Sequence, residues 1–491
     1  MEIGTSDSIL FHRRINELMS SPVATCHLSD TVTEVARTMG LRNISAVIVV
    51  NDQNEPVGLI TEKRLVAGLI AEPKDILSCR VETVMDSNMV TLPPDAYLHH
   101  ALLSVIKEGV KHLAVVEEKK LVGIVTLMDL VKARSAGTLW VARNIETQRT
   151  LTGLIETGRE VDLLLSALVA EKAPVPVLFE IMSEMHSRLT RQVIILCEEE
   201  MEREGYSSPP VPYCWLNLGS AGRGEQTLRT DQDNSIVYAD PPDGKATVIA
   251  EYFLHLGAKV VEGLARCGFT KCKGNIMASN PNWCRSVHEW HRVLDRWVSQ
   301  LNPSEVRDLT IFLDFRPVYG EPLLAHTLRE QAFTSWHSHA LTSHMLTRDE
   351  LQYRPPLGFL GKFITEKSGP HRDEINLKTS AAIHLVNCTR IFAVNHGVTE
   401  TSTLKRLQEL VALEAIDQDE AEYIRAAFET VMTLRIRENL RKHQIGQDPD
   451  DYIYPHKLSK LEQDMLRNAF SVTARLQRLT GKYFTDPRLN A

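Results

Sequence analysis

The sequence predicts a multidomain protein with an N-terminal pair of small α/β units, a second α/β core and a helical C-terminal domain. Three observations predict this architecture. Residues 15–66 repeat as residues 81–131, a motif of strand, turn and paired acids occupies residues 213–239, and helical periodicity dominates from residue 330 onward. At 491 residues the chain is too long for one hydrophobic core. We expect domains at residues 13–135, 206–330 and 331–491, with a helical connector at 136–205.

Composition excludes several classes of protein. Hydrophobic residues make up 43% of the chain and charged residues 24%, which is ordinary for a globular protein. The 55 Lys and Arg against 63 Asp and Glu give a formal net charge of −8. This balance argues against a nucleic-acid-binding surface, although a local basic pocket for a triphosphate stays compatible with it. Residues 1–10 lack a secretory pattern and no apolar stretch reaches membrane-spanning length, so we expect a cytoplasmic protein with no membrane partner.

The eight cysteines are scattered along the chain, which is typical of reduced thiols rather than of a disulfide framework. One cluster has the residue types of a zinc site but lacks the tight C-x-x-C pair that such sites usually show. Packing is therefore the favoured interpretation of these residues, which are Cys267, Cys272, Cys284, His288 and His291.

Both copies of the N-terminal repeat predict the same order of elements, an amphipathic helix followed by two strands and the start of a second helix. The first copy places its helix near residues 32–39 and its strands at 46–50 and 57–60. The second copy places them at 101–106, 113–116 and 121–125. Two such units resemble a CBS-domain tandem, which folds as one pseudo-symmetric module, and the resemblance covers roughly residues 13 to 135.

The turn from the last strand into the last helix carries the ligand chemistry of CBS domains, as the pattern Gly-h-h-Thr-x-x-Asp. The second copy keeps this pattern as Gly123, Thr126 and Asp129, whereas the first copy has Thr61 followed by Arg64. The resemblance implies that an adenine nucleotide, AMP or ATP, binds here, with Thr at the phosphate and Asp at the ribose hydroxyls. It also implies a homodimer, since CBS pairs often dimerise. The structural alternative is that Thr126 caps the helix and Asp129 is a first-turn carboxylate.

Residues 138–204 predict helices, divided by Pro174 and Pro176. After the prolines, apolar residues recur at helical spacing. They are Phe179, Met182, Met185, Leu189, Val193, Leu196 and Met201. This helix is predicted either to transmit a state of the N-terminal pair or to pack against the next domain.

The motif of residues 213–239 predicts an anion site beside a metal site. A short apolar strand leads into Gly219-Ser220, small residues that let the backbone approach phosphates, and Arg223 adds a forked donor. Asp231 and Asp233 stand two apart at the start of the next strand, so their carboxylates point the same way. Paired carboxylates beside a phosphate cradle are a way to hold Mg²⁺ on a nucleotide.

A third carboxylate is expected from a neighbouring strand. Residues 309–316 form an apolar stretch broken by Asp314, and we expect this stretch to be a strand with Asp314 on the face of Phe312 and Arg316. A lone acid in such a strand is costly unless it is paired or metal-bound, which makes Asp314 a candidate ligand.

This set resembles the DNA-polymerase-beta-like nucleotidyltransferase superfamily. The motif residues, together with the segments Gly274–Trp283 and Phe312–Gly320, are similar to those of a narrower group of nucleotidyltransferases. This group follows CBS or cyclic-nucleotide-binding domains in bacterial signalling proteins and is related to the PII uridylyltransferase. The resemblance implies Mg²⁺-dependent transfer of a nucleoside monophosphate from an NTP to a hydroxyl of a PII-like protein acceptor. It implies these roles for the residues: Mg²⁺ held by Asp231, Asp233 and Asp314, the acceptor activated by Asp314, and the triphosphate bound by Gly219, Ser220 and Arg223.

Three alternatives remain open at the level of the sequence. Asp231 and Asp233 could be isolated turn acids. The core could be a non-catalytic module that binds a nucleotide and passes its state to a partner. The acceptor could be a small molecule carrying a hydroxyl, although a sensor domain favours signalling.

The region 331–491 is expected to complete the pocket. Where the related family reads Asp-Leu-Lys, this chain has Asn376-Leu377-Lys378, and Lys378 is predicted either to contact phosphate or to lie in solvent. Arg390 interrupts an otherwise apolar helix. A basic stretch that could face the pocket or water comprises Arg435, Arg437, Arg441 and Lys442.

Overall fold

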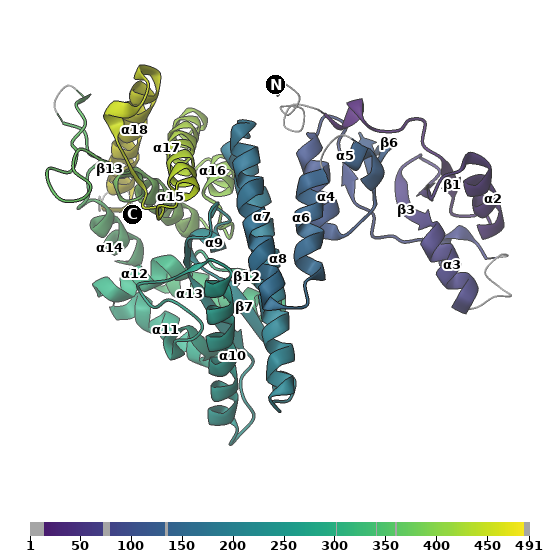
Figure 1. The fold of residues 1–491 in the computed structure, drawn as a ribbon, viewed down its shortest axis with the longest axis horizontal. Helices are drawn as coiled ribbons and strands as arrows, with labels where there is room; N and C mark the ends of the chain where they lie inside the picture. Colours follow the sequence, from purple (N-terminus) through teal and green to yellow (C-terminus); the bar gives the residue numbers. More distant parts are fainter. Residues whose placement is uncertain are drawn as a thin grey trace. The chain divides into compact units, whose positions relative to one another are not determined.

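The computed structural model describes residues 14–71, 79–132, 136–300, 302–339, 341–358 and 361–485. The chain divides into two compact units (Figure 1). The N-terminal unit comprises residues 1–143 with 170–174, and the C-terminal unit comprises residues 144–169 with 175–491. Within the described residues, no helix has both the length and the apolar character needed to cross a membrane.

The N-terminal unit confirms the repeat. Each copy forms a three-stranded sheet in which the first strand is parallel to the second and the second antiparallel to the third. The first copy comprises β1 (Thr25–His27), α2 (Val32–Arg42), β2 (Ala46–Val50), β3 (Pro56–Thr61) and α3 (Glu62–Ala71). The second comprises β4 (Thr91–Leu92), α4 (Leu98–Glu108), β5 (His112–Glu117), β6 (Lys120–Thr126) and α5 (Leu127–Lys132).

The two copies exchange their leading segments. Ile15 of the short helix η1 (Ile15–Glu17) packs into the core of the second copy, and Val81 of η3 (Val81–Thr83) packs into the core of the first. A shared cluster that includes Ile48, Val50 and Ala114 joins the two sheets. The pair therefore folds as one module, because neither copy completes its core alone.

The C-terminal unit is built on a sheet of four strands in the order β11-β9-β7-β12. The central strands β7 (Tyr213–Asn217) and β9 (Asn234–Tyr238) are antiparallel and buried along their whole length. β12 (Arg316–Gly320) pairs antiparallel with β7, and β11 (Cys284–Ser286) pairs parallel with β9. A separate short pair joins β8 (Asp231–Gln232) to β10 (Thr270–Lys271).

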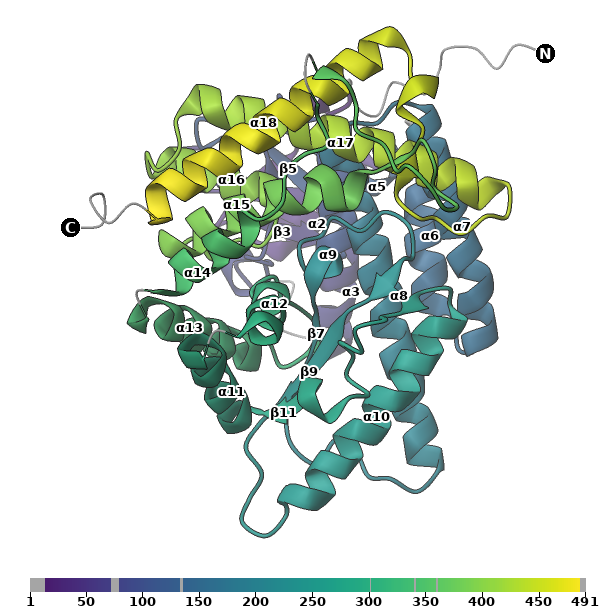
Figure 2. The ribbon, with the colours of Figure 1, turned by 90° about the vertical axis from the view of Figure 1, so that its left-hand side faces the viewer.

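Helices cover this sheet on both sides. Figure 2 shows α10 (Ala246–Arg266) on one side and α11 (Val287–Gln300) with α13 (Pro322–Ser338) on the other. The helix α8 (Val175–Arg203) packs against α10 and β12. The seven apolar residues predicted to form one face of α8 are all buried, which favours the packing alternative for this helix. It is preceded by α6 (Ala136–Thr147) and α7 (Leu151–Ala170).

One element differs from the prediction. Residues 303–312 form the helix α12 (Pro303–Phe312) rather than a strand, and β12 begins only at Arg316. Asn302 starts the helix, because its side chain accepts a hydrogen bond from the backbone N–H of Glu305. Asp314 consequently lies in the turn between α12 and β12, so strand alternation does not orient it.

The predicted helical region is confirmed as a bundle. Its helices are α14 (Leu341–Glu350), α15 (Ile383–Asn395), α16 (Thr403–Ala412), α17 (Gln418–Gln444) and α18 (Lys460–Thr485). A two-residue ladder between β13 (Ile375–Asn376) and β14 (Tyr452–Ile453) lies just before η6 (Lys378–Ala382), a single π-helical turn.

Candidate active site

The turn after β7 runs directly against the predicted acids. Gly219 opens the one-turn helix α9 (Gly219–Gly222) with φ of +53°, a conformation that L side chains rarely adopt. A Cβ atom at Gly219 would lie 2.9 Å from Oδ2 of Asp233. The backbone N–H of Leu218 donates to the carbonyl of Asp233 over 2.9 Å. Glycine is therefore required here both for the backbone conformation and for the approach to Asp233.

Asp231 and Asp233 share one face of their segment. Both are half-buried, while the intervening Gln232 and the following Asn234 are buried. The Gln232 amide donates to the carbonyl of Val261, and the Asn234 amide donates to Gln232. These bonds hold the segment in the extended conformation that places both carboxylates at the same surface.

The negative charge of Asp233 is disfavoured at this surface. Burial raises the pKa of the Asp233 carboxyl, and the charge of Asp231 raises it further. A hydrogen bond from Cys272 and the charges of Lys378 and Arg223 act in the opposite direction without reversing the shift. A bound cation would relieve this repulsion.

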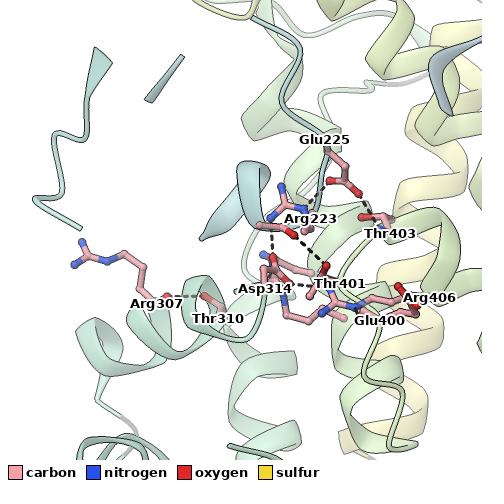
Figure 3. A network of polar contacts seen from close by, with 12 residues as sticks. Arg223, Glu225, Arg307, Thr310, Asp314, Glu400, Thr401, Thr403 and Arg406 are labelled. Carbon is pink, nitrogen blue, oxygen red and sulfur yellow. Dashed lines mark hydrogen bonds and ion pairs between the residues drawn. The ribbon is translucent and has the colours of Figure 1, made fainter. Parts of the chain in front are cut away.

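Asp314 does not join this pair, which corrects the expectation that it completes a three-acid metal site. Its side chain is fully buried and forms ion pairs with three arginines, namely Arg223, Arg390 and Arg406. Figure 3 labels Asp314 with Arg223 and Arg406. Burial alone would raise the pKa of this carboxyl, but the three positive charges outweigh burial and hold it well below its ordinary value. Across the described part of the chain, no group of three or more His, Cys, Asp and Glu residues could hold a metal ion.

Arg223 is correspondingly engaged. Its Nε donates to Glu225 over 2.6 Å and its Nη1 donates to Asp314 over 2.6 Å. The Arg223 guanidinium, which was predicted to bind phosphate, thus already donates to two buried carboxylates. The charge of Arg223 still acts on Asp233, so Arg223 adds positive potential to the site rather than a free pair of donors.

Lys378 is exposed, and its charge partly opposes the rise in the pKa of Asp233. At Asp451, burial opposes a lowered pKa that is due mainly to Arg435, with a smaller effect of Lys378. Within the basic stretch of α17, Arg435 donates to Asp451 over 2.6 Å. The other three members pair elsewhere, Arg437 with Glu462, Arg441 with Glu438 and Lys442 with Asp450.

A small cleft lies between residues 220–230, which we call the motif loop, and α17. The loop side comprises Ser220, Glu225, Gln226, Thr227, Leu228 and Thr230, and the α17 side comprises Met432, Arg435, Ile436 and Asn439. Ser220 is the predicted phosphate-binding residue of the loop side. On the α17 side the sequence singles out only Arg435, because a residue about 200 positions downstream carries no local signal of facing the loop.

The CBS residues show the predicted capping alternative. Thr126 donates through its N–H and its hydroxyl to Oδ2 of Asp129 over 2.9 and 2.7 Å, and Asp129 N–H returns a bond to Thr126 Oγ1 over 3.3 Å. Both side chains are half-buried. Gly123, expected at the ligand site, packs closely against Met19: a Cβ there would lie 2.3 Å from Met19 Sδ.

The first copy departs further. Thr61 Oγ1 accepts from the N–H of Arg64 over 3.3 Å. The Arg64 guanidinium donates to the carbonyls of Val84 and Met85 and lies 3.6 Å from Asp86. Arg64 therefore holds residues 84–86, which follow the exchanged helix η3. This contact accounts for an arginine where the CBS pattern has an aspartate.

Comparison with protein-family models decides the family. Residues 159–304 match the model described as putative nucleotidyltransferase DUF294, and residues 340–484 match its substrate binding domain. Residues 15–71 and 81–136 match the CBS domain. The chain belongs to the CBS-containing DUF294 nucleotidyltransferase family. The DUF294 model begins within α7, so it includes helices that precede the sheet.

Similar proteins cover only part of the chain. An uncharacterized protein of Methanopyrus kandleri is 29% identical over 119 residues, which are 24% of this chain and 61% of that protein. A mitochondrial CBS domain-containing protein of Arabidopsis thaliana is 26% identical over 112 residues, 22% of this chain and 54% of that protein. The uncharacterized protein YlbB of Bacillus subtilis is 33% identical over 118 residues, 24% of this chain and 79% of that protein. The chain thus spans less than two thirds of the first two relatives.

Among solved structures, a CBS-domain-containing protein of Agrobacterium tumefaciens is 26% identical with a TM-score of 0.23, covering 25% of this chain and 98% of that one. The CBS domain pair of protein MJ0100, in complex with 5-methylthioadenosine and S-adenosyl-L-methionine, is 25% identical with a TM-score of 0.23. It covers 25% of this chain and 96% of that one.

The packing of the DUF294 turn predicts that Gly222→Ala is disruptive. A Cβ at Gly222 would lie 2.0 Å from the carbonyl oxygen of Asp314 and 2.7 Å from that of Asn217, and neither backbone atom can rotate away. We expect a loss of about 1–3 kcal/mol in unfolding free energy, measured by chemical denaturation. Gly274→Ala is the matched control, because its Cβ would meet only ordinary contacts at 3.6 Å. Equal stability of the two variants would contradict the packing.

The raised pKa of Asp233 predicts that Asp233→Asn stabilises the metal-free protein at neutral pH. A carboxyl with a raised folded-state pKa binds its proton more tightly in the folded state, so its contribution is unfavourable at neutral pH and vanishes below the unfolded pKa of about 3.9. The melting temperature of Asp233→Asn should exceed that of the wild type at pH 7, and the difference should shrink as the pH falls toward 4. The exposed Asp243→Asn should show neither effect, and a destabilised Asp233→Asn at pH 7 would contradict the argument.

Proposed function

We propose that this chain transfers a nucleoside monophosphate from an NTP to an acceptor hydroxyl and releases pyrophosphate. The observation that carries the proposal is the placement of Asp231 and Asp233 on one surface against the Gly219 turn, with Ser220 and Arg435 lining the adjacent cleft. The family match supports a nucleotidyltransferase. This cleft lies between the core and the substrate binding domain.

The residues fit a magnesium ion carried by the nucleotide. Mg²⁺ is usually bound by one or two carboxylates together with substrate phosphates and water, so two acids suffice without Asp314. Asp231 and Asp233 would hold the ion. Burial, and to a lesser extent the charge of Asp231, raise the pKa of Asp233, and a cation would stabilise this carboxylate. When bound, Mg²⁺ would neutralise the charge that develops on the pyrophosphate.

The protein groups around the acids supply the remaining functions. The turn at Gly219 and Ser220 brings the backbone next to the acids, where it would position the phosphates. Lys378 and Arg223 provide positive potential beside Asp233, which favours a triphosphate over a neutral ligand. Activation of the acceptor hydroxyl, expected of Asp314, falls in this proposal to the Asp231 and Asp233 pair.

A non-catalytic nucleotide-binding module is the second candidate, and the saturation of Asp314 favours it. An enzyme of the expected design would present three acids, whereas this site presents two. This candidate predicts NTP binding without release of pyrophosphate.

Pyrophosphate release from each of the four NTPs with Mg²⁺, using labelled nucleotide and a cell extract as acceptor, separates the candidates. We expect release, label on one protein band, and a loss of at least about 100-fold in rate for Asp231→Asn and for Asp233→Asn. Asp243→Asn, an exposed acid of the same core, should retain the wild-type rate. Turnover retained in both site variants would exclude the proposed site, and binding of NTP by calorimetry without turnover would establish the second candidate.

The acceptor and the assembly are proposed from the family resemblance. A PII-like protein acceptor, a uridylyl or adenylyl group, a role in signal transduction and a homodimer are its implications for this chain. The cytoplasmic location is proposed from the sequence pattern alone. The label-transfer measurement identifies both the acceptor and the base.

We also propose that the CBS pair binds an adenine nucleotide at its second copy and thereby regulates the transferase. Thr126 and Asp129 lie together at the β6–α5 junction, where the carboxylate could exchange its bonds to Thr126 for bonds to ribose hydroxyls. Calorimetry with AMP and ATP should show binding that Asp129→Asn weakens by at least about tenfold. The exposed Asp52→Asn should bind as the wild type does, and equal affinities of all three proteins would place the ligand elsewhere.

A further inference from the structure

Every acceptor position of the buried Asp314 carboxylate is in use. Oδ1 accepts from Arg390 Nε over 2.9 Å and from Arg406 Nη1 over 2.8 Å. Oδ2 accepts from Arg223 Nη1 over 2.6 Å and from Arg390 Nη2. A carboxylate offers about four such positions, and the side chain of Asp314 is 0% exposed. A metal ion could therefore bind Asp314 only by displacing an arginine.

The three arginines come from two domains. Arg223 belongs to the motif loop of the core, whereas Arg390 lies on α15 and Arg406 on α16 of the substrate binding domain. Asp314 is thus the common partner of groups that belong to different parts of the C-terminal unit.

Two further hydrogen bonds connect the core with the substrate binding domain (Figure 3). Glu225, which pairs with Arg223, accepts from the N–H of Thr403 over 2.8 Å. The hydroxyl of Thr401 donates to the carbonyl of Gly222 over 3.0 Å. The segment that leads into α16 therefore contacts the motif loop at two points, Gly222 and Glu225.

The network carries more positive than negative charge. Arg223, Arg390 and Arg406 face the two carboxylates of Asp314 and Glu225, and burial together with the charge of Arg406 lowers the pKa of the neighbouring Arg329 to about 10. Removal of a carboxylate worsens this imbalance, whereas removal of one arginine reduces it. The effects of the two kinds of substitution should therefore differ in severity.

We infer that Asp314 is a positioning residue, which clamps the substrate binding domain onto the motif loop and thereby sets the nucleotide affinity of the cleft. The inference rests on the proposed function for its nucleotide, but the clamp itself is a property of the fold. It assigns to Asp314 a role that acts through Arg223, Arg390 and Arg406 rather than through a metal ion.

The first test separates positioning from metal ligation. Mn²⁺ alone is titrated by electron paramagnetic resonance, and Mn²⁺-NTP binding is measured by calorimetry. We expect Asp314→Asn to keep the wild-type Mn²⁺ affinity and to bind NTP between about 10-fold and 100-fold more weakly. Asp231→Asn should instead lose Mn²⁺ binding. Loss of Mn²⁺ binding in Asp314→Asn equal to that in Asp231→Asn would overturn the inference.

The second test uses charge balance. The double variant Asp314→Asn, Arg406→Gln removes one charge of each sign, and we expect it to recover part of the NTP affinity and melting temperature lost in Asp314→Asn alone. A metal ligand could not be replaced in this way, so the absence of any recovery in affinity contradicts positioning. Arg390→Gln and Arg406→Gln, which reduce the charge excess, keep the test available if Asp314→Asn does not fold.

The third test needs no nucleotide. Hydrogen exchange of the backbone amides in residues 218–228 and 400–407 should quicken in Arg390→Gln, under conditions where circular dichroism shows the variant to be folded. Arg437→Gln, whose partner Glu462 lies outside the network, is the matched control and should leave this exchange unchanged. Unchanged exchange in Arg390→Gln would overturn the clamp. Failure of the wild type to bind any NTP would instead count against the proposed function and leave this result standing.

Discussion

The ion pairs of Asp314 are the interaction on which the C-terminal unit depends. Breaking a buried ion pair is typically costly, because the partner charge stays buried without compensation. Here one carboxylate compensates three guanidinium groups, and these belong to the motif loop, α15 and α16. These ion pairs, together with the hydrogen bonds of Thr401 and Thr403, join the bundle to the loop that lines the cleft with α17.

Two aspartates of the same unit show how the surroundings shift the pKa of identical side chains in opposite directions. Arginine charges outweigh burial at Asp314 and hold its pKa low, and three guanidinium groups occupy its oxygens. Burial and the charge of Asp231 raise the pKa of Asp233, so the charged form of this carboxyl is disfavoured and a bound cation would stabilise it. The first environment suits a structural anchor, and the second suits a site that exchanges ligands.

The sequence predicted the CBS repeat, the helical bundle and the shared face of Asp231 and Asp233, because each rests on local periodicity or on alternation along a strand. It misassigned residues 309–316, where apolar content suggested a strand although Asn302 starts a helix. The partners of Asp314 lie 76 and 92 positions away on α15 and α16, and spacing along the chain cannot pair residues at such separations. An arginine in an apolar helix was the available signal, since a buried guanidinium requires a buried acid.

The helices that precede the sheet also reach the acid-bearing segment. Asp162 of α7 forms an ion pair with Arg229, whose Nη1 donates to the carbonyl of Cys267 over 2.6 Å. A Cβ at Gly158 of α7 would lie 2.1 Å from the same Nη1, so the helix and the guanidinium are in close contact. Arg229 stands two residues before Asp231. A shift of α7 along its axis must therefore move or break the ion pair between Asp162 and Arg229. Coupling between the chain that leaves the CBS pair and the two acids should be sought at this contact.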